Sequence, residues 1–246
     1  MCASFAKLDS TNLVQDGYNS TWKYSFPGSA ADFKDVACAV QSISMYNSEY
    51  NIDAAQFWNS SFKIEVPTAG TTSTVSVGLP EGLYNYTDIN RSIQTALVNA
   101  GAYLINPSGE NVFYIQLTEN SVYYAAQFDF SATPTTLPTA GGTWTRPASG
   151  LYFNTIPQIH PTSSYIVRCD LIKNEYVASG DILSAFDRGD AQVGQLISYK
   201  PSQYAWMNCY NGSRTSITIS IFNQNDQKVN FRDTSVSIML LLRPKK

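Results

Sequence analysis

The side chains that could support acid–base or nucleophilic catalysis are few in this chain. Such chemistry most often uses a histidine as the base, and the sequence has one, His160, in a segment that reads as extended. We expect this imidazole to be structural or to face solvent. The carboxyl groups of Asp170, Glu175 and Asp181 could serve a glycoside hydrolase, but spacing alone does not identify a working pair, and we expect solvated loop acids. The sequence therefore favours a protein that is not an enzyme.

Metal and phosphate sites are not indicated by the spacing of the residues that build them. The four cysteines, Cys2, Cys38, Cys169 and Cys209, include no pair at the short spacing typical of zinc sites. Gly141-Gly142 is not followed by the Lys-Ser/Thr and helix that a P-loop requires. We therefore expect no metal and no cofactor. Scattered cysteines also favour reduced thiols over a disulfide framework.

Two features could bind a partner. Arg188-Gly189-Asp190 spells the RGD tripeptide of integrin ligands, and we expect it in a loop; the alternative is that these are loop charges with Gly189 making a turn. Aromatic residues could also stack on sugars or bases, although packing in the core or between subunits is the favoured interpretation. The aromatic candidates are Tyr84, Tyr86, Tyr123, Tyr124, Trp144, Trp206 and Tyr210.

The composition is polar but poor in charge. Apolar residues make up 43% of the chain and charged residues only 14%, well below the average share, which suits surfaces that pack against neighbours. A net charge of −3 argues against a dedicated nucleic-acid binder. The basic cluster Arg243, Lys245 and Lys246 could make a weak genome contact, although such a short cluster is usually just solvated. We expect no signal peptide and no membrane span.

Alternating apolar residues predict strands along most of the chain. Trp22, Tyr24 and Phe26 alternate in 19–26, and the alternation of 36–45 changes phase near Gln41, which indicates a bulge. Hairpins are predicted from 62–66 with 75–77, and from 111–118 with 121–130 around a Glu119-Asn120 turn. Segments 217–221 and 236–242 flank a polar turn at 223–226 and predict a closing antiparallel meander.

One segment has clear helical spacing. Apolar residues recur from Ile89 to Ala100, Thr87 or Asp88 can cap the start, and Gly101 can end the helix. A second short helix is predicted over 181–186, and 131–150, rich in Thr, Pro, Ala and Gly, is expected to be an exposed loop. The pattern predicts an all-β fold in a single domain, 1–246, with an N-terminal arm at 1–18.

Three stretches together resemble the single jelly-roll penton, or minor capsid, proteins of Polinton-like viruses, virophages and related double-stranded DNA viruses. The first contains Asn51-Ile52, the turn Leu79-Pro80-Glu81-Gly82-Leu83-Tyr84 and the helix ending at Gly101. In that family a strand, a proline-glycine turn and a tyrosine lead into a short helix that lies against the sandwich. The second stretch runs from Tyr165 to Pro201, and the third from Ser216 to Arg243.

The resemblance implies a fold and a function. The fold is a single eight-stranded antiparallel jelly-roll sandwich with one or two short helices, because two rolls would need a longer chain. The function is that of a penton subunit, which forms homopentamers at five-fold vertices of the virion and contacts the double jelly-roll major capsid protein. Members of the family differ in whether they carry a large outer insertion domain, and here only 131–150 is expected as its remnant.

Two other functions remain open at this point. The chain could be another capsid subunit, such as a cement protein or a truncated major capsid chain that forms trimers. It could also be a carbohydrate-binding jelly roll that stacks Trp144, Trp206 or its tyrosines against sugar rings. The mass of the assembled protein and a glycan-binding assay separate these alternatives.

Overall fold

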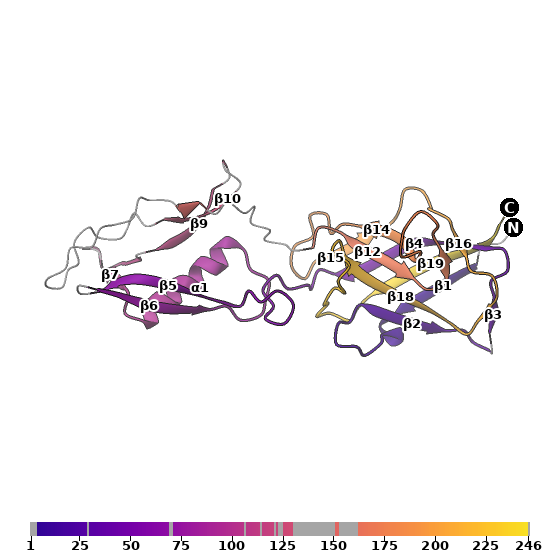
Figure 1. Ribbon diagram of the computed structural model, residues 1–246, viewed down its shortest axis with the longest axis horizontal. Helices are drawn as coiled ribbons and strands as arrows, with labels where there is room; N and C mark the ends of the chain where they lie inside the picture. Colours follow the sequence, from indigo (N-terminus) through magenta and orange to yellow (C-terminus); the bar gives the residue numbers. More distant parts are fainter. Residues whose placement is uncertain are drawn as a thin grey trace. The chain divides into compact units, whose positions relative to one another are not determined.

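The computed structural model describes residues 4–28, 30–68, 71–105, 107–113, 115–120, 122, 125–129, 151–152 and 162–245. The chain divides into two compact units, which we call the jelly-roll unit (Met1–Glu49 with Thr162–Lys246) and the insertion unit (Tyr50–Pro161) (Figure 1). This division differs from the single domain expected from the sequence. Both units are built from alternating strands, so neither pattern nor composition marks a boundary.

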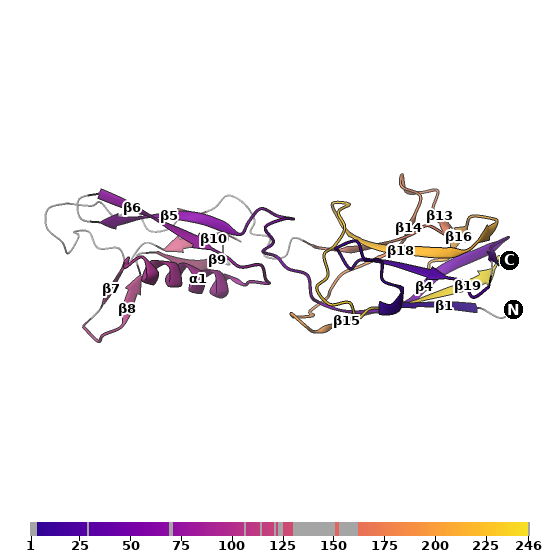
Figure 2. The ribbon, with the colours of Figure 1, turned by 90° about the horizontal axis from the view of Figure 1, so that it is seen from below.

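Two antiparallel sheets form the jelly-roll unit. The first contains, in spatial order, β1 (Ser4–Asp9), β19 (Ser237–Pro244), β4 (Val36–Tyr46), β16 (Met207–Cys209) and β13 (Ile172–Lys173), and β15 (Leu196–Tyr199) also pairs with β4. The second contains β14 (Ile182–Phe186), β12 (Tyr165–Cys169), β18 (Ser216–Asn223) and β2 (Thr21–Ser25). Two short strands, β3 (Ala31–Asp32) and β17 (Ser213–Arg214), pair with each other, and a 3-10 turn, η1, covers Ser10–Asn12. Figure 2 shows the two layers edge-on.

The order of these strands confirms the predicted all-β jelly roll. In chain order the principal strands of the described part are β1, β2, β4, β12, β14, β15, β18 and β19. The first, eighth, third and sixth share one sheet, and the second, seventh, fourth and fifth share the other. This interleaving, in which successive strands cross between two antiparallel sheets, is the jelly-roll topology.

Two expectations about the chain ends are wrong. The predicted terminal meander does not form, because β18 and β19 lie in different sheets and the chain between them crosses the sandwich. Residues 4–9 do not belong to a free arm: β1 pairs with β19 from Ser4↔Leu242 to Asp9↔Ser237. The first strand therefore closes the fold onto the last, and both termini lie at the same end of the unit (Figure 1).

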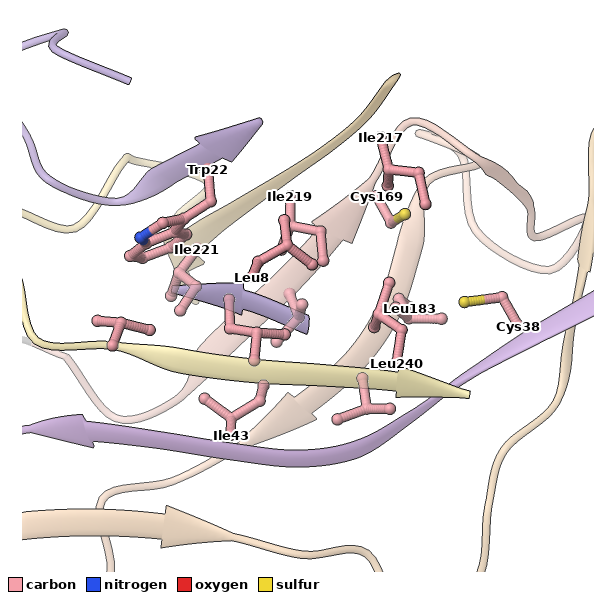
Figure 3. Close-up of a cluster of buried hydrophobic side chains, with 14 of the residues drawn as sticks. Leu8, Trp22, Cys38, Ile43, Cys169, Leu183, Ile217, Ile219, Ile221 and Leu240 are labelled. Carbon is pink, nitrogen blue, oxygen red and sulfur yellow. The ribbon is translucent and has the colours of Figure 1, made fainter. Parts of the chain in front are cut away.

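One apolar layer lies between the two sheets. Side chains that alternate inward from β2 and β18 meet side chains from β1, β4 and β19, and the pattern of inward residues follows the period of two expected of half-buried strands (Figure 3). The fully buried members include Leu8, Trp22, Ile43, Ile217, Ile219, Ile221 and Leu240. The alternation visible in the sequence therefore records which residues face this layer.

A bulge at Gln41 confirms the phase change seen in the sequence. Met239 pairs with Ser42 and Leu240 pairs with Val40, so Gln41 has no opposite residue. The extra residue lets Val40 and Ile43 both point into the core although they are three positions apart.

The helix predicted over 181–186 is wrong, and a second bulge explains the error. Residues Ile182–Phe186 form strand β14, whose register against β12 shifts between Val167 and Arg168. Leu183 and Phe186 both face the core as a result. A bulged strand thus repeats apolar residues three apart, which imitates helical spacing.

The insertion unit lies between β4 and β12 in the sequence and has a hydrophobic core of its own. Its elements are β5 (Ser61–Thr68), β6 (Thr71–Gly78), α1 (Tyr86–Asn99), β7 (Tyr103–Ile105), β8 (Asn111–Phe113), β9 (Gln116–Asn120), β10 (Ala125–Asp129) and β11 (Leu151–Tyr152). Ile93 and Leu97 of α1 pack there with Val66 and Val77 of the β5–β6 hairpin. The insertion is thus far larger than the remnant expected at 131–150, a segment that lies outside the described residues.

The predicted helix and the hairpin of 62–66 with 75–77 are confirmed, with shifted ends, whereas the hairpin of 111–118 with 121–130 is confirmed only in part. Asn85, rather than Thr87 or Asp88, caps α1: its Oδ1 accepts from the Asp88 N–H (2.8 Å), and the Asp88 carboxylate accepts from the Asn85 N–H (3.2 Å). Gly101 follows the helix at a φ of +66°. Glu119 and Asn120 belong to β9, which pairs with β10, rather than to a turn. Residues 111–113 form the separate strand β8, which pairs with β7. No helix in the described part combines the length and apolarity that a membrane crossing needs.

The two separate cores predict separable effects of core mutations. Ile219→Ala in the jelly-roll unit and Leu97→Ala in the insertion unit should each cost about 2–5 kcal/mol, the usual range for losing a large buried aliphatic side chain. Hydrogen exchange followed by mass spectrometry should show faster exchange in the mutated unit only. If Leu97→Ala lowers protection of β18 and β19 as much as that of α1, the chain behaves as one cooperative core.

Candidate functional site: a sheet face and a buried junction

The acidic residues singled out from the sequence have structural partners or face solvent. Asp170 accepts a hydrogen bond from the Thr218 N–H (2.8 Å), and Asp181 lies 3.7 Å from Arg168. The exposed Glu175 pairs with Lys173 across 2.7 Å. His160 lies outside the described residues. Within the described ranges, no group of three or more His, Cys, Asp and Glu side chains is arranged to hold a metal ion.

Three cysteines lie inside the jelly-roll core. Cys38, Cys169 and Cys209 are buried free thiols, in line with the expected reduced state, and Cys2 lies outside the described residues. Burial raises the pKa of Cys169 to about 12 and that of Cys209 to about 11, and it raises the pKa of Cys38 as well. The nucleophilic form of a cysteine is the thiolate, so these groups are unreactive near neutral pH. Figure 3 shows Cys38 and Cys169 beside the aliphatic side chains of the core.

A buried carboxyl group marks the place where the chain leaves and re-enters the jelly roll. Glu49, the last residue before the insertion unit, accepts hydrogen bonds from the Thr162 hydroxyl (2.5 Å) and the Tyr165 hydroxyl (3.3 Å). Thr162 is the first residue after the insertion unit. Burial raises the pKa of Glu49, while the two hydroxyls and the charge of Arg188 oppose that rise. We call this cluster the junction. It connects the residue at which the chain leaves the jelly-roll unit with the residue at which the chain returns to it.

The RGD tripeptide begins two residues after the end of β14. The charge of its arginine, Arg188, acts on Glu49 of the junction. The Gly189 N–H donates to the Asp187 carboxylate (2.8 Å), and Gly189 has a φ of +56°, so it makes the predicted turn. Asp190 is exposed, but Arg188 is half-buried and its charge acts on Glu49. A receptor-binding role for Arg188-Gly189-Asp190 stays a prediction.

The outer face of the first sheet, which we call the β1–β15 face, exposes large apolar side chains. Ala6 and Leu8 point inward, so Phe5 points outward and is 68% exposed. Tyr46 and Leu196 form a cross-strand pair on the same face and are 40% and 52% exposed. Phe5 and the Tyr46–Leu196 pair lie toward opposite ends of this face, since Phe5 aligns through Leu241 with Ala39 of β4. We treat the face as a candidate interaction surface.

Trp206 lies at the end of this face beside the basic C-terminal segment. The Arg243 guanidinium is 3.8 Å from the centre of the Trp206 ring, and the Tyr204 ring packs edge-on against that ring at 6.0 Å. A cation–π contact therefore occupies one face of the indole that a sugar would need. Of the other aromatic candidates, Tyr84 and Tyr86 pack against the insertion core and Tyr210 is exposed, whereas Tyr123, Tyr124 and Trp144 lie outside the description.

The outer face of the second sheet is different in character. Thr218 and Ser220 of β18 point outward there, since their neighbours Ile217, Ile219 and Ile221 fill the core. Arg168 is paired with Asp226 and Asp181 and lies 4.6 Å from the centre of the Phe222 ring. The outer face of the first sheet thus combines exposed apolar side chains with the Lys7–Asp9 ion pair, whereas that of the second sheet carries hydroxyls, the Arg168 ion pairs and the Phe222 ring.

Sequence reasoning missed the junction and the β1–β15 face. Glu49 was visible only as an isolated acid between the strand ending at Tyr46 and the apolar Ile52. Phe5 and Leu196 could not be assigned to one face without the strand register, because β1 and β15 are far apart in sequence and each pairs with a different neighbour.

The junction predicts a pH dependence of stability. The folded state raises the pKa of Glu49 above its ordinary value of 4.5, so its contribution is fully present below that pH and is lost as the pH rises through the folded pKa. Relative to Glu49→Gln, the wild type should therefore lose stability in denaturant unfolding between acidic and neutral pH. Thr162→Val removes a donor to the carboxylate and should extend the loss to higher pH. Parallel curves for wild type and Glu49→Gln would contradict this account.

Comparison by sequence finds no match to this chain, whereas comparison by structure does. No protein-family model matches the sequence, and no curated protein matches it. Among solved structures, the crystal structure of the mavirus penton protein is similar, with a TM-score of 0.51 and 12% identity over 98% of both chains. The similarity shows that this chain has a penton-like fold along nearly its whole length.

Proposed function

We propose that this chain is a structural capsid protein without enzymatic activity: a penton subunit that forms homopentamers at the five-fold vertices of a virion. The observation that carries this proposal is the jelly-roll strand order together with a fold similar to that of the mavirus penton protein over 98% of both chains. The same proposal places the protein in the capsid, in contact with a double jelly-roll major capsid protein.

The outer faces of the two sheets are two different surfaces, as the contacts between neighbouring subunits of a closed ring require. A closed ring uses heterologous contacts, in which one surface of a subunit meets a different surface of the next. The β1–β15 face offers exposed apolar groups, and the outer face of the second sheet offers hydroxyls and ion pairs. Interfaces that combine an apolar centre with a polar surround are typical of stable complexes. We therefore place the lateral contact of neighbouring subunits on the β1–β15 face.

The basic C-terminal end supports a weak genome contact at most. Arg243 is engaged with Trp206, and the Lys245 N–H donates to the Asp35 carbonyl (2.7 Å). Lys246 lies outside the described residues. Affinity for nucleic acid rises with the number of phosphates neutralised, and this short segment offers few cations. We expect capsid incorporation to depend on protein contacts.

The oligomeric mass tests the proposal. Native mass spectrometry of the purified chain should give five times its 27.2 kDa mass, and negative-stain images should show five-fold rings. The double variant Phe5→Asp/Leu196→Asp should shift the mass to monomer, because two charges would be buried in the contact, while circular dichroism stays unchanged. Val122→Asp, at an 84% exposed apolar residue of the insertion unit, is the matched control and should remain pentameric.

Other masses decide against the proposal. A wild-type chain that stays monomeric at high concentration and does not bind the major capsid protein contradicts it, and a trimer selects the cement or major-capsid alternative. A pentamer that survives the double variant retains the penton function and moves the contact elsewhere.

A further inference from the structure

Strand β6 of the insertion unit has one edge that no described strand pairs, and the hydrogen-bonding groups along this open edge can be assigned from its register. Among the described strands, β6 pairs with β5 alone. The Leu79 N–H donates to the Ser60 carbonyl (2.7 Å), and in an antiparallel ladder bonded and non-bonded pairs alternate. Ile64↔Val75 and Phe62↔Val77 are therefore bonded pairs, and the N–H and C=O groups of Thr74 and Ser76 point away from β5.

A groove runs along this open edge. It has a volume of about 630 Å³, within the usual range of ligand sites, and its strand side includes Thr74, Ser76 and Gly78. Thr74, Ser76 and Gly78 all direct their backbone groups away from β5, as the ladder requires. The groove therefore borders the outward backbone groups of β6, which pair with no described strand, rather than a side-chain surface alone.

Helix α1 forms the opposite wall of the groove. Its lining residues follow one flank of the helix, and most are small: Arg91, Ser92, Thr95, Ala96, Asn99 and Ala100. The Ser92 and Thr95 hydroxyls already donate to the Asp88 and Arg91 carbonyls (3.2 and 2.9 Å). A wall of short side chains leaves room for a polypeptide backbone between the helix and the strand edge.

Arg91 gives the groove its charge. It is the charged residue among those lining the groove, its side chain is 74% exposed, and its ion pair with Asp88 is long at 3.7 Å. An exposed pair of this kind is weak, so the guanidinium is available to a carboxylate in the groove.

We propose that the groove between the open edge of β6 and α1 binds an extended acidic polypeptide segment of a partner protein, which adds to β6 as a further strand. Strand addition satisfies the outward N–H and C=O groups of Thr74 and Ser76, and Arg91 pairs with an acidic side chain of the segment. A second copy that paired through its own β6, Thr71–Gly78, would offer Arg91 no carboxylate from that strand, so the charge of the groove favours an acidic segment of a partner.

The edge itself is tested first in the free protein. Amide hydrogen exchange resolved by residue should be fast for Thr74 and Ser76 and slow for Val75 and Val77, whose N–H groups bond to β5. Slow exchange at Thr74 and Ser76 in the free chain would overturn the proposal, since the edge would already be occupied.

Binding is tested by selecting random linear dodecapeptides from a display library on the full-length chain. The selected peptides should be acidic, should protect the Thr74 and Ser76 amides, and should bind Ser76→Pro at least about tenfold more weakly, the effect of roughly one lost hydrogen bond. Proline removes an N–H that points away from β5, so the hairpin keeps its bonds, and Ser76→Ala is the matched control that retains binding. Arg91→Glu should weaken binding as well.

The remaining outcomes overturn the proposal. These are the absence of selected peptides, equal binding to Ser76→Pro and Ser76→Ala, or self-association of the chain that Ser76→Pro abolishes, which would assign the edge to a second copy. The pentamer mass of Ser76→Pro is measured in parallel, so that failure of this site is distinguished from failure of ring assembly.

Discussion

The apolar layer between the two sheets is the constraint on which the rest of the molecule depends. Each sheet buries one face, and the first strand, β1, contributes Ala6 and Leu8 to the layer between them by pairing with the last strand, β19. That pairing brings the two chain ends together and leaves the outward residues of β1, β4 and β15 on one continuous face. The surface assigned to subunit contacts thus follows from closing the core, because residues that alternate inward fix which residues point outward.

The insertion unit is compatible with this core because the two residues that flank it in the sequence are joined at the junction. Glu49 and Thr162 are hydrogen-bonded to each other, so the chain can depart between β4 and β12 without separating the strands that enclose the layer. An ionised carboxylate is costly to bury, and three polar neighbours offset part of that cost. The insertion unit brings its own core and can therefore carry a separate binding edge while the jelly roll supplies the lateral contacts.

Strand positions could be predicted from the sequence wherever inward residues alternate, as at 217–221, and even the bulge at Gln41 was visible as a change of phase. The strand 182–186 was misassigned because its bulge places Leu183 and Phe186 at a helical interval. The division into two units was hidden because strands of both units alternate alike. The open edge of β6 and the β1–β15 face depend on register between distant segments, which local periodicity does not encode.

Replacing residues 50–161 by a short flexible linker tests most directly whether the jelly roll alone folds and carries assembly. The account predicts a shortened chain that unfolds cooperatively, retains a β-sheet circular dichroism spectrum and forms rings with the same number of subunits as the full chain in native mass spectrometry. An unfolded product, or a folded monomer where the full chain forms rings, would contradict it.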